Sequence, residues 1–328
     1  MYTIKDVALK AGLSQATVSR VINNHPYVSE DKKQAVQKAM VELGYVPNSS
    51  AQRLRNIKTK KVAVLISRIV NPFFSQLVDA MEQKAAKHGY QLILCNTRIS
   101  PEKELDYFQL LQSKQVDGII LAAAENKWEA IAPYTKYGTV IYCNEYDPNA
   151  TVTRVRLDQV EGGYIGTKHL LDKGHRKIGY CQGNDSSVSV NRRKGYLKAI
   201  TEAGIEPNPE WMFKDVFTVE NGREIFRHIA TMDNPPTAFF TGSDEVAAGM
   251  IKEAQLNGWR VPEDLAVVGF DDQPIATLMD PQFTTINQFT SNIGEKAMEV
   301  MLEIIEKKRE NKAEDILLPL ELIERQST

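Results

Sequence analysis

The side chains best suited to chemistry in this 328-residue sequence lie on one short segment near the N-terminus. Val18, Val21 and Ile22 recur at the spacing of one helical face, so we expect them to pack inward. The opposite face carries Gln15, Ala16, Ser19, Arg20 and Asn23. Glutamine can pair with adenine, arginine can pair with guanine, and an alanine methyl can touch that of thymine. This face therefore predicts base-specific contact with DNA.

The residues around this segment predict two short helices joined by a glycine turn. Thr3 can cap a first helix, and Asp6 would lie in its first turn, where the helix dipole favours an acid. Gly12 tolerates the positive φ of a helix end, and Ser14 can begin the next helix. The pair has the shape of a helix-turn-helix, in which Ser14 and Thr17 suit phosphate contacts.

An ordinary helical hairpin with a polar face would show the same pattern. What favours the DNA-binding interpretation is a third predicted helix, which begins at Ser29 and stops at Gly44. Three helices close a small bundle.

Charge is distributed unevenly along the chain. Residues 1–60 contain ten Lys or Arg and four Asp or Glu, a net charge of +6, whereas the whole chain carries −2, which leaves −8 on residues 61–328. A basic head can neutralise phosphates, and an acidic body is not expected to touch them. The charge distribution therefore supports DNA binding by the head, as the helical pattern does.

Four stretches of the head carry a family resemblance. They are Thr3-Ile4-Lys5-Asp6-Val7-Ala8, Ala11-Gly12-Leu13-Ser14, Ala16-Thr17-Val18-Ser19-Arg20-Val21-Ile22-Asn23 and Leu43-Gly44-Tyr45-Val46-Pro47-Asn48. They closely resemble the head of the lactose-repressor (LacI/GalR) family of bacterial transcription regulators, and the likeness covers essentially the whole chain. It implies a helix-turn-helix domain at residues 1–46, in which we also count Thr3 among the DNA contacts.

Residues 47–60 are expected to form a hinge helix and linker. Asn48 is a good N-cap, and a helix of about eight residues is too short to be stable alone, so it needs a partner surface or DNA. The resemblance implies that this helix pairs with its twin in the minor groove. Leu54 matches the leucine that the family wedges between base steps, and Asn48, Ala51 and Arg55 complete the expected hinge contacts.

Residues 61–328 alternate between strand-like and helical segments. The strand-like runs are 61–66, 90–95, 116–122, 139–143, 177–181, 237–240 and 265–270, and examples of the helical stretches are 75–88, 161–173 and 244–257. Such alternation predicts parallel sheets with helices on both faces. A body of this size should split into two cores. The fold class we expect is an all-α helix-turn-helix head plus an α/β body of two doubly wound lobes.

The resemblance implies a periplasmic-binding-protein-like body for effector binding and dimerisation. It places the first lobe at about 61–160 and 291–322 and the second at about 161–290 and 323–328. A cleft between such lobes collects the carboxyl ends of strands from both sides, where ligands bind. The residues expected to form the effector pocket are Phe73, Phe74, Asn144, Arg192, Phe217, Ser243 and Asp271.

Each pocket residue also has an ordinary structural interpretation. Phe73 and Phe74 could simply be core, Arg192 could be solvated like its neighbours Arg193 and Lys194, and Asp271 could merely end a strand. The aromatic rings suit a sugar face or a base equally well. Many family members have an aspartate where this chain has Asn144, and several sugar-binding members have an asparagine at Ser243. Asn144 keeps hydrogen bonding without charge, so we expect a cationic effector to be disfavoured.

The sequence lacks the signatures of an enzyme. The five histidines have no metal-type spacing, and no nucleotide-binding, serine-hydrolase or zinc-protease motif occurs, so we expect no catalytic residue, no metal and no cofactor. Asp244 and Glu245 suit the first turn of a helix. The cysteines, Cys95, Cys143 and Cys181, are odd in number and lack a paired motif, so we expect buried free thiols.

The sequence predicts a cytoplasmic protein without a membrane partner, because it has no N-terminal apolar region of a signal peptide and no apolar run that approaches the length of a membrane span. The alternative is a sugar- or nucleoside-binding receptor of the periplasmic-binding-protein type, without a DNA role. Such a receptor would need a signal peptide and would have no use for a basic helical head.

The sequence as a whole predicts a transcriptional regulator, in our interpretation a repressor. It would bind a pseudo-palindromic operator as a homodimer, with its affinity set by a small effector. A sugar or sugar phosphate is the first choice of effector and a nucleoside or purine the second, and a co-effector protein stays open. The operator sequence, the direction of the effector's action and the choice between dimer and tetramer stay open as well.

Overall fold

The structure is a computed structural model that describes residues 2–22, 25–45 and 58–328. The chain divides into two compact units, residues 1–58 and 59–328, here called the head and the body. The predicted DNA contacts at Asn23, Asn48, Ala51, Leu54 and Arg55 lie outside the described residues.

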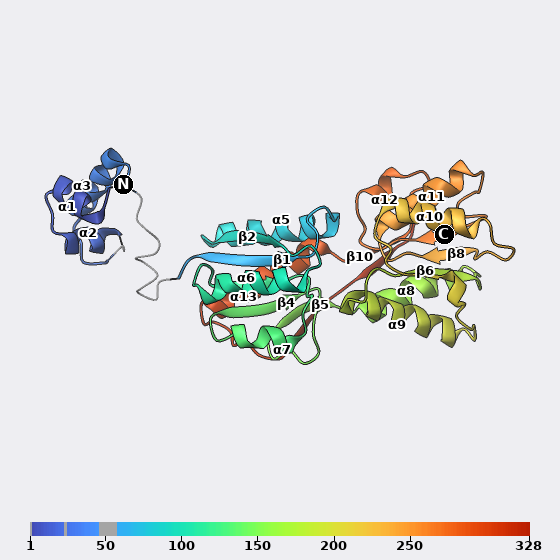
Figure 1. Ribbon diagram of the computed structural model, residues 1–328. Coiled ribbons are helices and arrows are strands. Elements are labelled where there is room, and N and C mark those ends of the chain that lie inside the picture. The colour runs from blue at the N-terminus through green and yellow to red at the C-terminus, as the bar shows by residue number, and fades with distance from the viewer. Residues whose placement is uncertain (1, 23–24, 46–57) are drawn as a thin grey trace. The chain divides into compact units, whose positions relative to one another are not determined.

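The described part of the head contains α1 (Ile4–Ala11), α2 (Gln15–Ile22) and α3 (Glu30–Leu43) (Figure 1). The backbone N–H and the hydroxyl of Thr3 both donate to the Asp6 carboxylate at 2.7 Å, which fixes the start of α1. Gly12 ends this helix in the left-handed conformation at φ 65°, and Leu13 N–H bonds the Ala8 carbonyl beneath it. The turn between α1 and α2 is thus set by one residue that tolerates positive φ.

The three helices of the head share one small core. Val7, Val18 and Val36 are completely buried at its centre, with Ala8, Val21 and Ala39 around them. The inward stripe of α2 is as expected at Val18 and Val21. Because this stripe occupies one face of α2, the polar face is left at the surface.

The first lobe of the body is built on a parallel sheet. Among the described residues its strand order is β11-β5-β4-β3-β1-β2. The strands are β1 (Lys61–Ile66), β2 (Gln91–Asn96), β3 (Gly118–Leu121), β4 (Thr139–Cys143), β5 (Arg154–Leu157) and β11 (Asp315–Leu318). The helices are α5 (Pro72–Lys87), α6 (Pro101–Gln112), α7 (Trp128–Ile131), the short 3-10 turn η1 (Ala132–Tyr134) and α13 (Thr290–Ile305).

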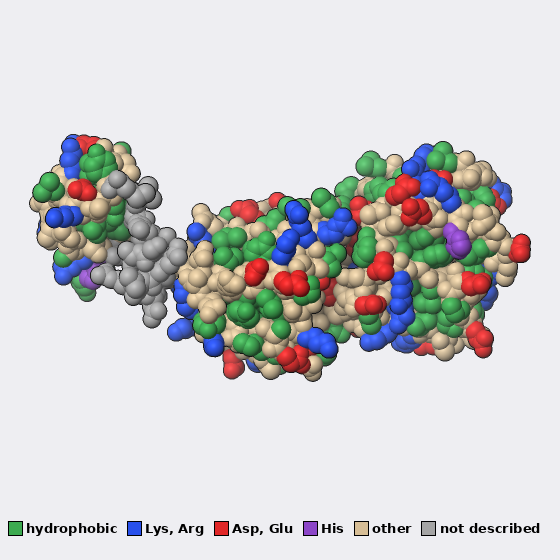
Figure 2. Space-filling view, in the orientation of Figure 1, with side chains coloured by type: hydrophobic (Ala, Val, Ile, Leu, Met, Phe, Trp, Pro, Cys, Tyr) green, Lys and Arg blue, Asp and Glu red, His purple; other side chains and the backbone are tan. Residues whose placement is uncertain are grey.

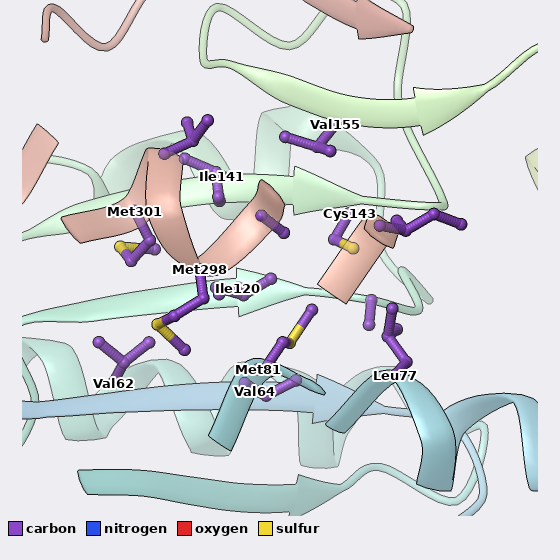
Figure 3. Close-up of a cluster of buried hydrophobic side chains, with 14 of the residues drawn as sticks. Val62, Val64, Leu77, Met81, Ile120, Ile141, Cys143, Val155, Met298 and Met301 are labelled. Carbon is purple, nitrogen blue, oxygen red and sulfur yellow. The ribbon is translucent and has the colours of Figure 1, made fainter. Parts of the chain in front are cut away.

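Both faces of this sheet are covered. Val62 and Val64 of β1 pack in one cluster with α5 and α13, as Figure 3 shows for the side chains drawn there. Ala63 and Leu65 point the other way, into a cluster with α6 and α7. Successive residues of a strand face opposite sides, so a strand buried on both faces must be apolar throughout.

The second lobe repeats this plan with a smaller parallel sheet, ordered β7-β6-β8-β9 in the described residues. Its strands are β6 (Ile178–Cys181), β7 (Met212–Phe213), β8 (Ala238–Phe240) and β9 (Ala266–Val268). Its helices are α8 (Gln159–Asp172), α9 (Ser187–Glu202), the 3-10 turn η2 (Pro209–Trp211), α10 (Val219–Ile229), α11 (Asp244–Leu256) and α12 (Ile275–Leu278). The α/β body of two doubly wound lobes is confirmed.

The chain passes between the lobes after β5, after β10 (Thr285–Asn287) and after β11 (Figure 1). Strand β10 pairs antiparallel with β12 (Glu321–Ile323) and joins the second lobe through the hydrogen bond from Asp271 N–H to the Ile286 carbonyl. The expected lobe division therefore needs a correction at its last crossing. Glu321 and Leu322, assigned to the first lobe, pair with a strand of the second.

The thiols of Cys95, Cys143 and Cys181 are buried and free. None of the helices that the structure describes is long and apolar enough to cross a membrane.

Helices α8 and α9 approach unusually closely because glycines form their contact. A Cβ on Gly163 would lie 2.1 Å from the Arg192 carbonyl oxygen, and one on Gly195 would lie 2.0 Å from the Val160 carbonyl oxygen. Each contact is with backbone and cannot be relieved by a side-chain rotation. This packing holds Arg192 at a fixed depth in the lobe.

We predict that Gly163→Ala destabilises the protein by roughly 1 to 3 kcal/mol, because the added methyl forces the two helices apart. The measurement is the free energy of unfolding in urea. Lys168→Ala, on the exposed side of the same helix, is the control and should change this free energy by less than about 0.5 kcal/mol. Equal stabilities of Gly163→Ala and wild type would contradict the close approach.

Candidate functional site

The polar face of α2 lies on the surface of the head. Gln15, Ala16 and Arg20 are exposed, and Ser19 is half-buried. The Ser14 hydroxyl accepts from Thr17 N–H at 3.2 Å and lies 2.9 Å from the Thr17 hydroxyl, so both hydroxyls stand at the start of α2. The structure thus presents in one place the described side chains that could contact bases and phosphates.

The body contains a cavity of about 190 Å³ that is lined from both lobes. This is several times the roughly 30 Å³ that one water molecule occupies in the liquid. All seven of the residues expected to form an effector pocket line it: Phe73, Phe74, Asn144, Arg192, Phe217, Ser243 and Asp271. The structure therefore brings all seven side chains to one cavity.

The aromatic wall of the cavity is also part of the core. Pro72 begins α5 directly after Asn71, whose side-chain oxygen accepts from Phe73 N–H at 2.9 Å. Phe73 and Phe74 then pack edge to face, with ring centroids 5.3 Å apart, and both belong to the core of the first lobe. The two rings thus belong to the core and line the cavity at the same time. Phe217 contributes a half-buried ring from the other lobe.

Arg192 is buried and bonded on several sides, unlike a solvated arginine. Its Nε donates to Gln159 Oε1 and its Nη1 to the Gly242 carbonyl, both at 2.8 Å, and its Nη2 donates to Gln288 Oε1 at 3.4 Å. The guanidinium also lies over the Phe270 ring, 3.4 Å from the centroid. Gln159 and Gln288 sit where the chain crosses between lobes, so Arg192 joins the cavity to two crossings.

Asp271 faces this arginine from the end of β9. Its carboxylate accepts hydrogen bonds from the side-chain amides of Gln288 and Gln273. Burial raises the pKa of Asp271 to about 6, although the charge of Arg192 acts in the opposite direction. Asp244 lies beneath it, completely buried, and accepts from Gln273 N–H at 2.6 Å. Burial, with the neighbouring charge of Asp271 added, raises the pKa of Asp244 well above its usual range.

Asn144 lines the cavity and has a buried side-chain oxygen without a hydrogen-bond donor in the described part of the chain. Its backbone is left-handed at φ 68°, its N–H bonds the Val155 carbonyl at 2.9 Å, and its side chain is 5% exposed. Among the described residues no group donates to its Oδ1 atom. A buried oxygen without a donor loses the hydrogen bonds that it would form with water, and no protein group replaces them. A ligand or a water molecule that donates to this atom would restore the missing bond.

Three acids that were not expected from the sequence line the same cavity. Glu125 follows β3, Glu145 follows β4 next to Asn144, and Glu245 lies in the first turn of α11. The rule that ligands meet the carboxyl ends of strands would have found Glu125 and Glu145. Glu245 was expected in the first turn of a helix, where it lies, but this helix begins at the cavity. No sequence pattern marks Gln159 and Gln288 as partners of Arg192, because they reach it only through the places where the chain crosses between the lobes.

Glu145 reaches across from the first lobe to the second. Its carboxylate accepts from the Ser187 hydroxyl at the beginning of α9, while Tyr146 N–H donates to that hydroxyl at 3.2 Å. The Asn191 side chain donates to the Tyr146 hydroxyl at 2.9 Å. Burial raises the pKa of Glu145, and the hydrogen bonds from the start of α9 act against this. The lobes therefore touch through an acid placed at a helix N-terminus.

We predict that Asp271 makes the ligand-free protein less stable as the pH rises. Its folded pKa of about 6 exceeds the usual 3.8, so its stabilising contribution is complete below pH 4 and is lost as the pH passes through 6. In urea unfolding, wild type should therefore lose roughly 2 kcal/mol relative to Asp271→Asn between pH 4 and 7. The exposed Asp233→Asn should follow wild type, and parallel curves for Asp271→Asn would refute the burial argument.

Comparison with known proteins gives relatives over the full length. The chain is 41% identical over 329 residues to the NTD biosynthesis operon regulator NtdR of Bacillus subtilis, with 100% of both chains covered. It is 35% identical to the transcriptional repressor PurR of Mannheimia succiniciproducens, covering 100% of this chain and 98% of that one. Both relatives are named as regulators rather than enzymes.

Solved structures share the whole architecture. The Lac repressor dimer bound to operator and the anti-inducer ONPF matches with a TM-score of 0.86 at 26% identity, over 99% of this chain and 98% of that one. The complex of the transcriptional regulator CelR with cellobiose matches with a TM-score of 0.74 at 29% identity, over 100% of both.

Family models cover nearly every residue. The model of bacterial regulatory proteins of the lacI family matches residues 3–48, and that of periplasmic binding proteins and the sugar-binding domain of the LacI family matches 59–326. The head and the body thus match in the order that the family requires, so the chain is a DNA-binding transcriptional regulator with an effector-binding body, and it belongs to the LacI family.

Proposed function

We propose that this regulator is a repressor that binds a pseudo-palindromic operator as a homodimer, with the α2 face of each head in a major groove. Its domains are the head at 1–46, the hinge at 47–60 and the body from 61 onward. The DNA contacts are Thr3, Ser14, Gln15, Ala16, Thr17, Ser19, Arg20, Asn23, Asn48, Ala51, Leu54 and Arg55. It works in the cytoplasm, where its DNA is, and a co-effector protein has no specific support.

One observation carries this proposal: a single chain joins an exposed polar recognition face to a cavity lined from two lobes. A receptor without a DNA role has no use for the first feature. On the side of the body drawn in Figure 2, basic and acidic side chains are interspersed, which leaves the basic head as the natural partner of phosphates. The Lac repressor structure, a dimer on operator DNA, supports the same assembly.

The effector in this proposal is a sugar held by Phe73, Phe74, Asn144, Arg192, Phe217, Ser243 and Asp271. Family structures named with bound cellobiose, sucrose and glucose support a sugar. The described residues that line the cavity include four acids and two arginines, which disfavours a sugar phosphate. The relatives named PurR keep a nucleoside or purine as the second candidate.

Control of DNA binding by the effector follows from the bonds of Arg192. A ligand hydroxyl that accepts from its guanidinium competes with Gln159 and Gln288, and both glutamines sit at crossings between the lobes. The ligand then favours one lobe arrangement by its difference in affinity for the two. The hinge joins the body to the head. The preference for one lobe arrangement is therefore passed through the hinge to the heads, as a change in operator affinity.

Nuclease footprinting with the full-length protein on the promoter fragments of its own operon tests the proposal. We expect a protected two-fold-related site whose affinity changes when a sugar effector is added, and the sign of the change distinguishes an inducer from a corepressor. Absence of a protected site at low salt, with and without sugars, would refute the proposal.

We predict that Arg20→Ala weakens binding to the specific operator by roughly 1 to 3 kcal/mol more than binding to random DNA, because a guanine contact is lost. Electrophoretic mobility shifts on both DNAs measure the difference. Lys10→Ala is the matched control, since it removes the same charge from the head but from an ion pair with Glu42 at 3.0 Å. Equal losses on both DNAs would mean that Arg20 contacts phosphate.

A further inference from the structure

The acids that line the cavity differ in what compensates their charge. Asp271 lies beside Arg192, and Glu145 meets the N-terminus of α9. Glu245 lies in the first turn of α11, and the charge of Arg68 lowers its pKa against the effect of burial. A helix N-terminus or a guanidinium thus offsets each of these three carboxylates.

Glu125 has no such compensation. It lies on the loop after β3, which is held in place because the buried Glu104 carboxylate accepts from Glu125 N–H at 3.1 Å and from Asn126 N–H at 2.8 Å. Within the described residues, no lysine or arginine forms an ion pair with Glu125, although Thr97 gives it a hydrogen bond. Burial raises the pKa of Glu125 to about 7, and the charges of Glu104 and Glu145 add to the effect.

A second observation at the same place points to a missing partner. Strand β4 is the neighbour of β3, so Asn144 leaves the same sheet edge as Glu125 and lines the same cavity. Its Oδ1 atom is buried without a donor. A carboxylate without a cation and an amide oxygen without a donor therefore lie on adjacent loops, and both need N–H or O–H groups.

The partner is not a metal ion, since no group of three or more His, Cys, Asp or Glu in the described chain is arranged to hold one. An organic ammonium fits better because it donates in several directions at once. It can bond a carboxylate and an amide oxygen together, and a charge-assisted bond in a buried place is among the strongest available.

We propose that the effector carries a protonated amine, whose ammonium group binds the Glu125 carboxylate and the Asn144 Oδ1 atom. This inference rests on the proposed function, because it names the chemical class of the ligand in the same cavity. It also revises our expectation that Asn144, as a neutral residue, disfavours a cationic ligand. The negative charge for the cation comes from the neighbouring loop, at Glu125.

The first test compares four sugars that share a ring and differ in charge: glucosamine, N-acetylglucosamine, glucose and glucose 6-phosphate. Calorimetric titration of the full-length protein at pH 7 should show glucosamine binding at least about tenfold more tightly than the others, as expected of one charge-assisted bond. Binding of glucose or N-acetylglucosamine as tight as that of glucosamine, or no binding of glucosamine, would overturn the proposal.

The second test uses Glu125→Gln, which keeps the shape and removes the charge. The variant should lose the preference for glucosamine. Without ligand it should melt about 2 to 4 °C higher than wild type, because an uncompensated charge has been removed. Glu129→Gln removes the same charge from an exposed position of the first lobe and should change neither property. A lower melting temperature for Glu125→Gln would assign this residue a structural role instead.

Operator binding separates the two proposals. If wild type and Glu125→Gln both bind the operator but glucosamine shows no preference, only the amine is refuted. If wild type binds no operator, the proposed function is refuted as well.

Discussion

The bonding of Arg192 is the constraint on which the body depends. A buried guanidinium needs acceptors on most sides, and here they come from Gln159, Gln288 and the Gly242 carbonyl. Two of these acceptors stand where the chain leaves one lobe for the other. The hydrogen bonds that the Arg192 guanidinium needs therefore hold this part of the cavity wall and two of the crossings in one arrangement. The glycine contact between α8 and α9 also positions Arg192, because it sets how closely the backbone of Arg192 approaches α8.

The head and the body follow different physical logic. The head buries a few valines, and the polar side chains of α2 stay outside its core. The body buries both faces of its sheets, so the interiors of the covered strands are apolar, and charged residues are favoured at the strand ends. Strand ends differ from strand interiors in being free to carry charge, and the acids Glu125, Glu145 and Asp271 all follow strands. These three acids, which line the cavity, are consequently carried by loops that a rigid sheet holds in place.

The sequence was most informative where apolar runs are continuous. The ranges 61–66 and 139–143 coincide with β1 and β4, because strands covered on both faces leave no polar position. Strand β5, Arg-Val-Arg-Leu, escaped notice since it alternates charged and apolar residues, and β10 and β12 are too short to show a period. In the cavity, Arg192 and Asp271 were placed through the family likeness. The glutamines that bind them were not, because their role arises only from the path of the chain.

The contact between Glu145 and Ser187 has a consequence of its own. It joins the first lobe to the second, and it keeps an acid away from water. Any opening of the cleft exchanges this contact for hydration of the carboxylate, a gain that increases with alkalinity and vanishes when the acid is protonated. The empty protein thus has an intrinsic bias between its arrangements, set by the acidity of the surroundings before any metabolite arrives.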